Sequence, residues 1–154
     1  MDSEKHLTLV ESLYPTVQRR TQSDRPAITV ECDRLLELMQ TLRDHAGLRF
    51  DLLLTHTAVD YPDENRFELL YLLYSTVHGT RILVATNLER SRPVAPSVCG
   101  IWPIAEWQER EAYDLMGILY DEHPDLRRIF LEDDWEGFPL RKDYQDSYML
   151  ELPK

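Results

Sequence analysis

The sequence predicts an α+β protein: a single domain with a mainly antiparallel sheet of about four strands, helices packed on that sheet, and an extended C-terminal tail. The order of helix-like and strand-like segments and three consecutive strand-like runs between residues 49 and 88 indicate this fold class. At 154 residues the chain can bury a core without disulfides or structural metals. We therefore assign residues 1–117 to the domain and residues 118–154 to an extended C-terminal docking segment.

Two helices are expected in the first third of the chain. The first has four apolar residues at helical spacing ahead of Pro15: Leu7, Val10, Leu13 and Tyr14. A polar loop at 16–25 and a short strand at 27–30 follow. The second helix has Asp33 as its expected N-cap and Gly47 as its stop. Four residues form its apolar face: Leu35, Leu38, Met39 and Leu42.

Three strands are expected next. The run 49–56 alternates, with four side chains predicted on one face: Phe50, Leu52, Leu54 and His56. A connection at 58–66 leads to the run 67–75, which is apolar on both faces and therefore predicts a central strand. A hairpin at Gly79, which can adopt positive φ, leads to the strand 81–88. Residues 90–96 are expected to leave the core.

Composition and charge exclude several classes of function. The net charge of −11 repels phosphate backbones and no dense basic run offsets it, so nucleic acid is an unsuitable partner. An acidic solvated surface is the simple interpretation, and a basic partner protein is the sharper one. Cys32 and Cys99 are far apart and outside any C-x-x-C pair, which excludes cysteine-ligated zinc or iron–sulfur clusters within the chain. The sequence alone does not decide whether these two cysteines form a disulfide.

The N-terminal sequence has no apolar run suited to export, and no window reaches the roughly 20 apolar residues of a membrane helix. We therefore expect a reducing, cytoplasmic compartment. The chain also has no G-x-G-x-x-G motif and only 5 glycines, so a dinucleotide-binding loop is not expected in it. No catalytic, cofactor-binding or metal-binding residues are expected.

Residues 104–116 predict an amphipathic helix that ends at Gly117. Its apolar arc is expected to contain Ile104, Ala105, Ala112, Leu115 and Met116. Its solvent face is expected to contain Glu106, Glu109, Arg110 and Asp114. Glu106 and Arg110 have the favourable order for a helical ion pair, and Arg110 with Asp114 has the weaker reverse order.

Glu111 falls at the edge of that apolar arc, one turn after Trp107, so its carboxylate is expected to be partly desolvated. It either pairs with an arginine of its own chain or serves an interface or site. Glu109 and Glu111 cannot act as paired acids, because positions i and i+2 of a helix point about 200° apart.

After a short β-type run at 118–120, His123 precedes Pro124 in a turn that it is expected to cap or bridge. The histidines lack the spacing of metal ligands. Between residues 125 and 144 apolar residues stand singly among charges, as side chains that dock into another surface would, although a tail packed on its own domain gives the same pattern. These residues are Leu126, Ile129, Phe130, Trp135, Phe138, Leu140 and Tyr144.

The second half of the chain resembles a family signature without gaps from Glu109 to Tyr144. It is similar to the respiratory complex I 30 kDa subunit, also called the C subunit of NADH:quinone oxidoreductase. The matching residues are Glu109, Arg110, Glu111, Asp114, His123, Pro124, Leu126, Arg127, Arg128, Ile129 and the run Trp135, Glu136, Gly137, Phe138, Pro139, Leu140, Arg141, Lys142, Asp143 and Tyr144.

The resemblance implies a peripheral-arm subunit without a redox centre, on the cytoplasmic side of the cell membrane, that packs on the quinone-site subunit, itself similar to a hydrogenase large subunit. FMN, iron–sulfur clusters and quinone would belong to partner subunits, and membrane contact would be indirect. The candidate polar contacts are Glu111, Arg127, Arg128, Arg141, Lys142 and Asp143, and the candidate packing anchors are Trp107, Trp135 and Tyr144.

Alternatives remain at this point. Related membrane-bound hydrogenases, formate hydrogenlyase-type complexes and oxidoreductases fed by ferredoxin or the deazaflavin F420H2 share the signature. A free-standing hydrolase would use acidic residues with His123, and a stand-alone acidic binding module would need no complex.

Overall fold

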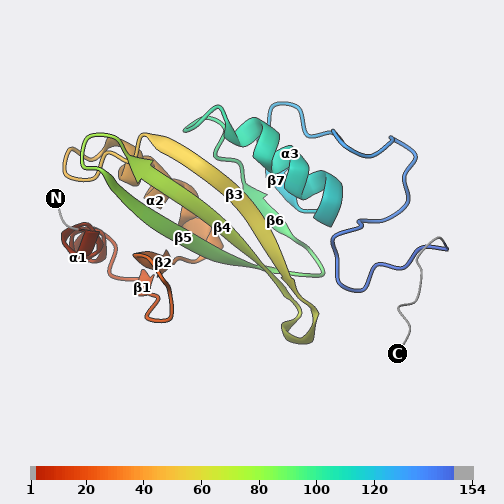
Figure 1. Cartoon of the computed structure of the whole chain (residues 1–154), viewed down its shortest axis with the longest axis horizontal. Coiled ribbons are helices and arrows are strands. Elements are labelled where there is room, and N and C mark those ends of the chain that lie inside the picture. The colour runs from red at the N-terminus through yellow and green to blue at the C-terminus, as the bar shows by residue number, and fades with distance from the viewer. Residues whose placement is uncertain (1–2, 148–154) are drawn as a thin grey trace.

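The computed structural model describes residues 3–147 (Figure 1). The elements are α1 (Ser3–Leu13), β1 (Gln18–Arg19), β2 (Ala27–Thr29), α2 (Cys32–Asp44), β3 (Leu52–Tyr61), the 3-10 turn η1 (Pro62–Glu64), β4 (Arg66–Ser75), β5 (Thr80–Glu89), β6 (Val94–Pro96), α3 (Ala105–Met116) and β7 (Leu119–Asp121). Residues 122–147, which we call the C-terminal segment, contain no further helix or strand. Within residues 3–147, no helix combines the length and apolar character needed to cross a membrane.

The main sheet has five strands in the order β1-β2-β5-β4-β3, and only the β2–β5 pair is parallel. The predicted α+β class with a mainly antiparallel sheet is confirmed. The sheet gains a strand over the expected four because Gln18 and Arg19, placed in a loop, pair with β2. Residues 90–96 also stay with the domain, since β6 pairs with β7 in a two-stranded parallel sheet.

The core lies on one face of the main sheet. Every second side chain of β4 is fully buried there: Phe67, Leu69, Tyr71 and Leu73. All three helices contribute buried side chains to the same apolar cluster, with α2 behind the strands and α3 running beside β3 (Figure 1). The four apolar residues predicted for the face of α2 are all completely buried, which confirms that helix.

The ends of α2 differ from the prediction. Glu31 is the N-cap, with no side-chain hydrogen bond, and Asp33 lies inside the first turn, where its charge interacts favourably with the helix dipole. The helix stops at Asp44 rather than at Gly47, because His45 is extended and its carbonyl accepts from the amides of the following turn. Gly79 has φ +66°, as the predicted hairpin requires.

Strand β3 corrects two expectations. A register shift between Leu53 and Thr55 turns Leu53 and His56 into the core, while Leu52 and Leu54 are 43% and 40% exposed. The predicted shared face of Leu52, Leu54 and His56 is therefore wrong, because a bulge adds one residue to the alternation. The strand also continues to Tyr61, so most of the connection expected at 58–66 is strand and η1.

Candidate functional site

The polar side of α3 is buried under the C-terminal segment. Glu109, Arg110 and Asp114 are 0%, 2% and 0% exposed, so the prediction that they face solvent is wrong. The helix projection places these charged residues opposite the apolar arc, a face that is normally solvated. In the structure each of them has buried hydrogen-bond partners that offset its desolvation. Ile104, assigned to the apolar arc, is 49% exposed.

Asp114 organises the beginning of the C-terminal segment. Its Oδ2 accepts from the amides of Ile129, Phe130 and Leu131 at 3.0, 2.7 and 3.1 Å. Its Oδ1 accepts from Arg128 Nη1 at 2.9 Å. Burial raises the pKa of Asp114, but the Phe130 amide, the Arg128 guanidinium and the other amides outweigh it and hold the pKa below its usual value. Three successive backbone donors on one carboxylate oxygen fix this turn.

Arg128 extends the same network along the segment. Its guanidinium also donates to the carbonyl of Asp114 at 2.9 Å and, through Nη2, to the carbonyls of Trp135 and Gly137 at 3.1 and 3.2 Å. The guanidinium carbon lies 5.3 Å from the centre of the Phe138 ring. One side chain therefore fastens residues 135–137 to α3.

Arg110 forms a second connection from α3. It donates to the carbonyls of Arg127 and Arg128 at 3.1 and 3.2 Å and lies 5.0 Å from the Trp107 ring centre. Within residues 3–147 no ion pair joins it to Glu106 or Asp114, so the predicted helical ion pairs are wrong. Its guanidinium instead binds backbone carbonyls of the C-terminal segment.

Strand β3 anchors the far end of the segment through Asp60. This carboxylate, 2% exposed, accepts from Arg90 at 2.8 and 3.1 Å and from the amide of Lys142 at 2.9 Å. Arg90 also binds Asp143 at 2.7 Å. Burial raises the pKa of Asp60, yet Arg90 and the Lys142 amide keep it below its usual value. Sequence reasoning missed Asp60 and Arg90, because neither position carries a periodic signal.

Arg141 closes the contact between the segment and the domain. Its Nε donates to the carbonyl of Met116 at 2.7 Å, and its guanidinium carbon lies 4.7 Å from the Phe138 ring centre and 5.3 Å from that of Phe67. Gly117 has φ +73°, and a Cβ there would lie 2.6 Å from Phe138 and 2.7 Å from Arg141. This glycine ends α3, as predicted, and also makes room for the segment.

The remaining predicted site residues lie at the periphery. Arg127 pairs with Asp125 at 2.8 Å. The Lys142 ammonium is 5.7 Å from the Tyr61 ring centre. The Tyr144 ring packs against Gly137. Glu111 is exposed, so its predicted desolvation is wrong. Glu109 and Glu111 do point apart, one buried and one exposed, as predicted.

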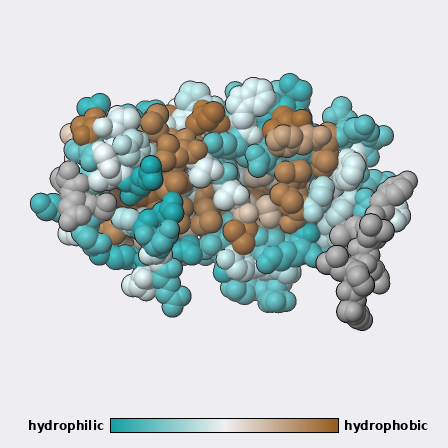
Figure 2. All heavy atoms as spheres, in the orientation of Figure 1, coloured by the Kyte–Doolittle hydropathy of each residue, from teal (hydrophilic) through white to brown (hydrophobic). Residues whose placement is uncertain are grey.

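Large apolar side chains remain exposed around these connections. Six of the eleven exposed large hydrophobic residues lie between positions 104 and 140, namely Ile104 (49%), Trp107 (55%), Leu119 (46%), Phe130 (64%), Trp135 (38%) and Leu140 (56%). Figure 2 shows hydrophobic atoms gathered over the α3 end of the molecule. We call these six residues the α3–tail surface. Its two tryptophans belong to a residue type that often dominates binding energy at interfaces.

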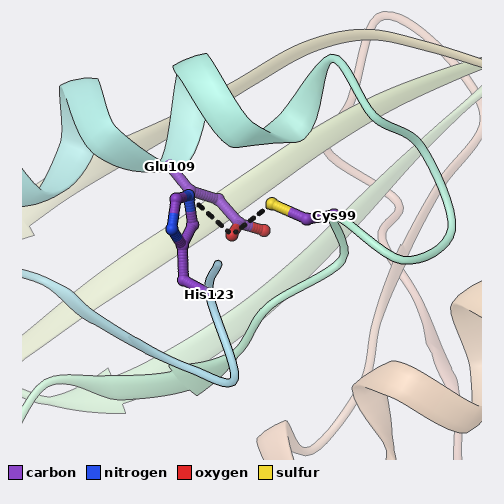
Figure 3. Close-up of side chains that lie close together, drawn as sticks. All are labelled: Cys99, Glu109 and His123. Carbon is purple, nitrogen blue, oxygen red and sulfur yellow. Dashed lines mark hydrogen bonds and ion pairs between the residues drawn. The ribbon is translucent and has the colours of Figure 1, made fainter. Parts of the chain in front are cut away.

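Beneath α3, Cys99, Glu109 and His123 form a buried polar cluster (Figure 3). Glu109 accepts from the Ser97 hydroxyl at 2.6 Å, the Val98 amide at 2.8 Å and the Cys99 thiol at 3.3 Å. Burial raises the pKa of Glu109, and burial raises that of Cys99 to about 12. The thiol is therefore protonated at neutral pH and acts as a donor.

These three donor types suit zinc, and their ligand atoms lie within 4.8 Å of one another. The hydrogen bonds of His123 argue against a metal. Nδ1 accepts from the Asp125 amide at 3.0 Å, so Nε2 carries the proton and donates to the carbonyl of Glu106 at 3.1 Å. No ring lone pair is then available to a cation. The contact with Asp125 confirms that His123 bridges its turn.

The fold and site define an α+β domain whose buried charges hold a C-terminal segment in place. The family model of the respiratory-chain NADH dehydrogenase 30 Kd subunit matches residues 28–148. The chain belongs to this family.

Proteins with similar sequences belong to the same subunit type. The NADH-quinone oxidoreductase C subunit of Moorella thermoacetica is 45% identical over 136 residues, covering 88% of this chain and 90% of that protein. Its counterpart in Mycolicibacterium gilvum is 45% identical over 123 residues, covering 79% of this chain and 54% of that protein. This chain therefore spans about half the length of some relatives.

Two solved structures are similar. One, the membrane-bound sulfane sulfur reductase, an archaeal respiratory membrane complex, matches with a TM-score of 0.81 at 27% identity, covering 92% of this chain and 85% of that one. The other, a trypsin-resistant fragment (1–134) of Nqo5, matches with a TM-score of 0.69 at 26% identity, covering 82% of this chain and 100% of that one.

Proposed function

We propose that this chain is a non-catalytic scaffold subunit in the peripheral arm of a proton-translocating NADH:quinone oxidoreductase, complex I. Through α3 and residues 118–154 it packs on the quinone-site subunit, which is similar to a hydrogenase large subunit. FMN, iron–sulfur clusters and quinone belong to partner subunits, and this chain supplies no ligand to them. It lies on the cytoplasmic side of the membrane and reaches the membrane only through the complex.

The α3–tail surface is the observation that carries this proposal. Phe130 is 64% exposed although its own amide is held at 2.7 Å by the buried Asp114. Leu140 is 56% exposed, while its amide donates to the carbonyl of Leu115 at 3.0 Å. A backbone fixed before binding loses little conformational entropy when a partner covers its side chains. The segment is thus preorganised for docking, and the names of the relatives supply the kind of complex.

Glu111, Arg127 and Lys142 are the charged signature residues that we assign to polar contacts with the neighbour, because their side chains lie at the surface. Arg128, Arg141 and Asp143 support the segment from within the chain. Trp107 and Trp135 are the aromatic anchors of the α3–tail surface.

A second candidate is the equivalent scaffold position in a related membrane-bound complex, such as a hydrogenase, a formate hydrogenlyase or a ferredoxin- or F420H2-linked oxidoreductase. The match to the sulfane sulfur reductase, with a TM-score of 0.81, supports a related membrane-bound complex as the second candidate. Identifying the other proteins of the native complex separates the two candidates, since only the NADH-linked form needs nucleotide- and flavin-binding subunits.

A hydrolase built on His123 has no physical support. Both ring nitrogens of His123 are engaged with backbone groups of Asp125 and Glu106, so no basic nitrogen is free to accept a proton from water.

Co-expression of a tagged chain with the other peripheral subunits tests the proposal. The double substitution Phe130→Ser and Leu140→Ser removes two exposed anchors without touching the buried network, and it should weaken co-purification about tenfold or more. Leu36→Ser is the matched control, because Leu36 is a 39% exposed leucine on α2, and it should co-purify normally. A wild-type chain that stays monomeric while the other subunits assemble without it would contradict the proposal.

A further inference from the structure

The main sheet has a second face that carries no helix among residues 3–147. Register places Leu52, Tyr74 and Arg81 side by side on this face. Two residues further along β4, Leu72 lies opposite Leu83, and Leu70 follows. We call the patch formed by Leu52, Leu70, Leu72, Tyr74 and Leu83 the open sheet face. Figure 2 shows hydrophobic atoms gathered along strands β3 to β5 on the side turned toward the viewer.

The open sheet face is unusually apolar for a face that no helix covers. An antiparallel sheet with one solvated face normally alternates apolar residues inward with polar residues outward. Here β4 has Leu69, Tyr71 and Leu73 in the core and the half-buried Leu70, Leu72 and Tyr74 on the other side. The outward positions therefore have the character of a surface that another protein covers.

We propose that the open sheet face binds a short amphipathic helix of a neighbouring subunit, with an apolar stripe on the sheet and a carboxylate beside Arg81. The proposal extends the proposed function, since the neighbour belongs to the same complex, but it concerns a different surface from the α3–tail surface.

Size favours a helix and excludes an independent dimer. The patch spans four residue steps along β4 and three strands, or roughly 14 by 10 Å. A helix is about 10 Å across and rises 1.5 Å per residue, so about nine helical residues would cover it. A stable interface needs about 800 Å² per partner, far more than the patch offers. A second copy is also disfavoured because each chain has a net charge of −11. The occupant therefore belongs to a subunit that is also held elsewhere.

Charge identifies one end of the occupant. At the far end of this face the charges already pair within the chain, with Glu68 binding Arg20 at 2.7 Å and lying 3.8 Å from Arg66. At the other end the exposed Arg81 lies 5.7 Å from the Tyr74 ring centre, and the ion pairs found within residues 3–147 do not include it. An unpaired guanidinium beside an apolar patch favours a carboxylate on the partner.

Site-specific photo-crosslinking in the purified complex tests this inference. A photoreactive amino acid replaces Leu52, and in a matched experiment it replaces Leu36, because these leucines are 43% and 39% exposed on opposite sides of the molecule. We expect position 52 to crosslink to a helical segment of another subunit, with a yield about tenfold above that of position 36. Arg81→Glu should lower that yield several-fold and Arg81→Lys should largely retain it, while both variants keep the thermal midpoint of the wild type.

Each outcome decides something different. Co-purification with equal yields at positions 52 and 36 overturns this inference and leaves the proposed function standing. Crosslinks between two copies of the chain, or to a segment without helical character, would contradict the identification of the occupant as a helix of another subunit. A chain that does not co-purify with the other subunits overturns the proposed function and this inference together.

Discussion

The two halves of this molecule are held together by different forces. In the α2–β4–β5 half, completely buried apolar side chains such as Leu38, Leu69 and Leu73 provide the contacts. In the α3–C-terminal half, buried charges such as Asp114 and Asp60 provide them, each with several hydrogen-bond donors. Apolar packing is non-directional, whereas a network of buried charges depends on the position of each hydrogen-bond donor and acceptor. The second half thereby gains a defined backbone that leaves its apolar side chains exposed.

Asp114→Ala should produce the largest loss of stability. It leaves the Arg128 guanidinium and three amides without their acceptor, which should cost about 3–5 kcal/mol of unfolding free energy. Urea unfolding followed by tryptophan fluorescence measures this. Asp133→Ala is the control, since Asp133 is exposed and should change little. A loss below about 1 kcal/mol for Asp114→Ala would show that the network does not hold the segment.

Leu73→Ala should cost about 3 kcal/mol, through the lost apolar contacts and the cavity left in the core. Hydrogen exchange distinguishes it from Asp114→Ala. Both variants should lower protection of the β4 and β5 amides that exchange by global unfolding, but only the aspartate variant should also let Ile129, Phe130 and Leu131 exchange rapidly through local opening. Identical exchange patterns for the two variants would contradict the division into two halves.

His56 of β3, which stacks on Tyr71 and hydrogen-bonds Tyr120, should make the domain core sensitive to acid. Burial lowers its pKa from 6.5 to about 4, so the folded state favours the neutral ring. The stability from that preference is fully present above pH 6.5 and falls as pH decreases toward 4, by about 3 kcal/mol in total. His56→Phe should flatten this part of the pH profile of unfolding, and His45→Phe should leave it unchanged. A profile that His56→Phe does not alter would contradict this assignment.

Glu109→Gln should have the smallest effect, less than about 1 kcal/mol at neutral pH. Burial raises the pKa of Glu109, so the folded state favours the protonated form. The single oxygen of a glutamine can still accept from the Val98 amide, and its NH2 group can donate to the Ser97 hydroxyl oxygen. The unfolded state loses this proton at a lower pH than the folded state, so the wild type loses stability as pH rises from the unfolded-state pKa to the raised folded-state pKa. The Gln variant should therefore gain stability relative to the wild type over that range. Unfolding at several pH values measures the difference. A strong loss at neutral pH would mean that the ionised carboxylate is required.

The apolar half could be predicted because its signal is periodic. The spacing of Leu35, Leu38, Met39 and Leu42 identifies α2, and Gly79 identifies the hairpin. The β-bulge between Leu53 and Thr55 could not be predicted, because a bulge shifts the strand pairing by one residue without changing which residue types the strand contains.

The charged half was predicted less well, because its partners are distant in the sequence. Asp114 binds amides 15–17 residues away, and Asp60 binds the amide of Lys142, 82 residues away. Hydrophobic periodicity contains no information on such contacts and assigns isolated charges to solvent. The family signature did identify Asp114, Arg128 and Arg141 as important, but it did not indicate that they bind their own chain.

Hydroxyl-radical footprinting of the free chain and of the purified complex tests the docking of the α3–tail surface most directly. Oxidation of Phe130, Trp135 and Leu140 should fall several-fold in the complex, because a partner covers side chains that the free chain exposes. Oxidation of Leu36 should stay the same. Equal oxidation of Phe130, Trp135 and Leu140 in both states would show that no subunit packs on this surface.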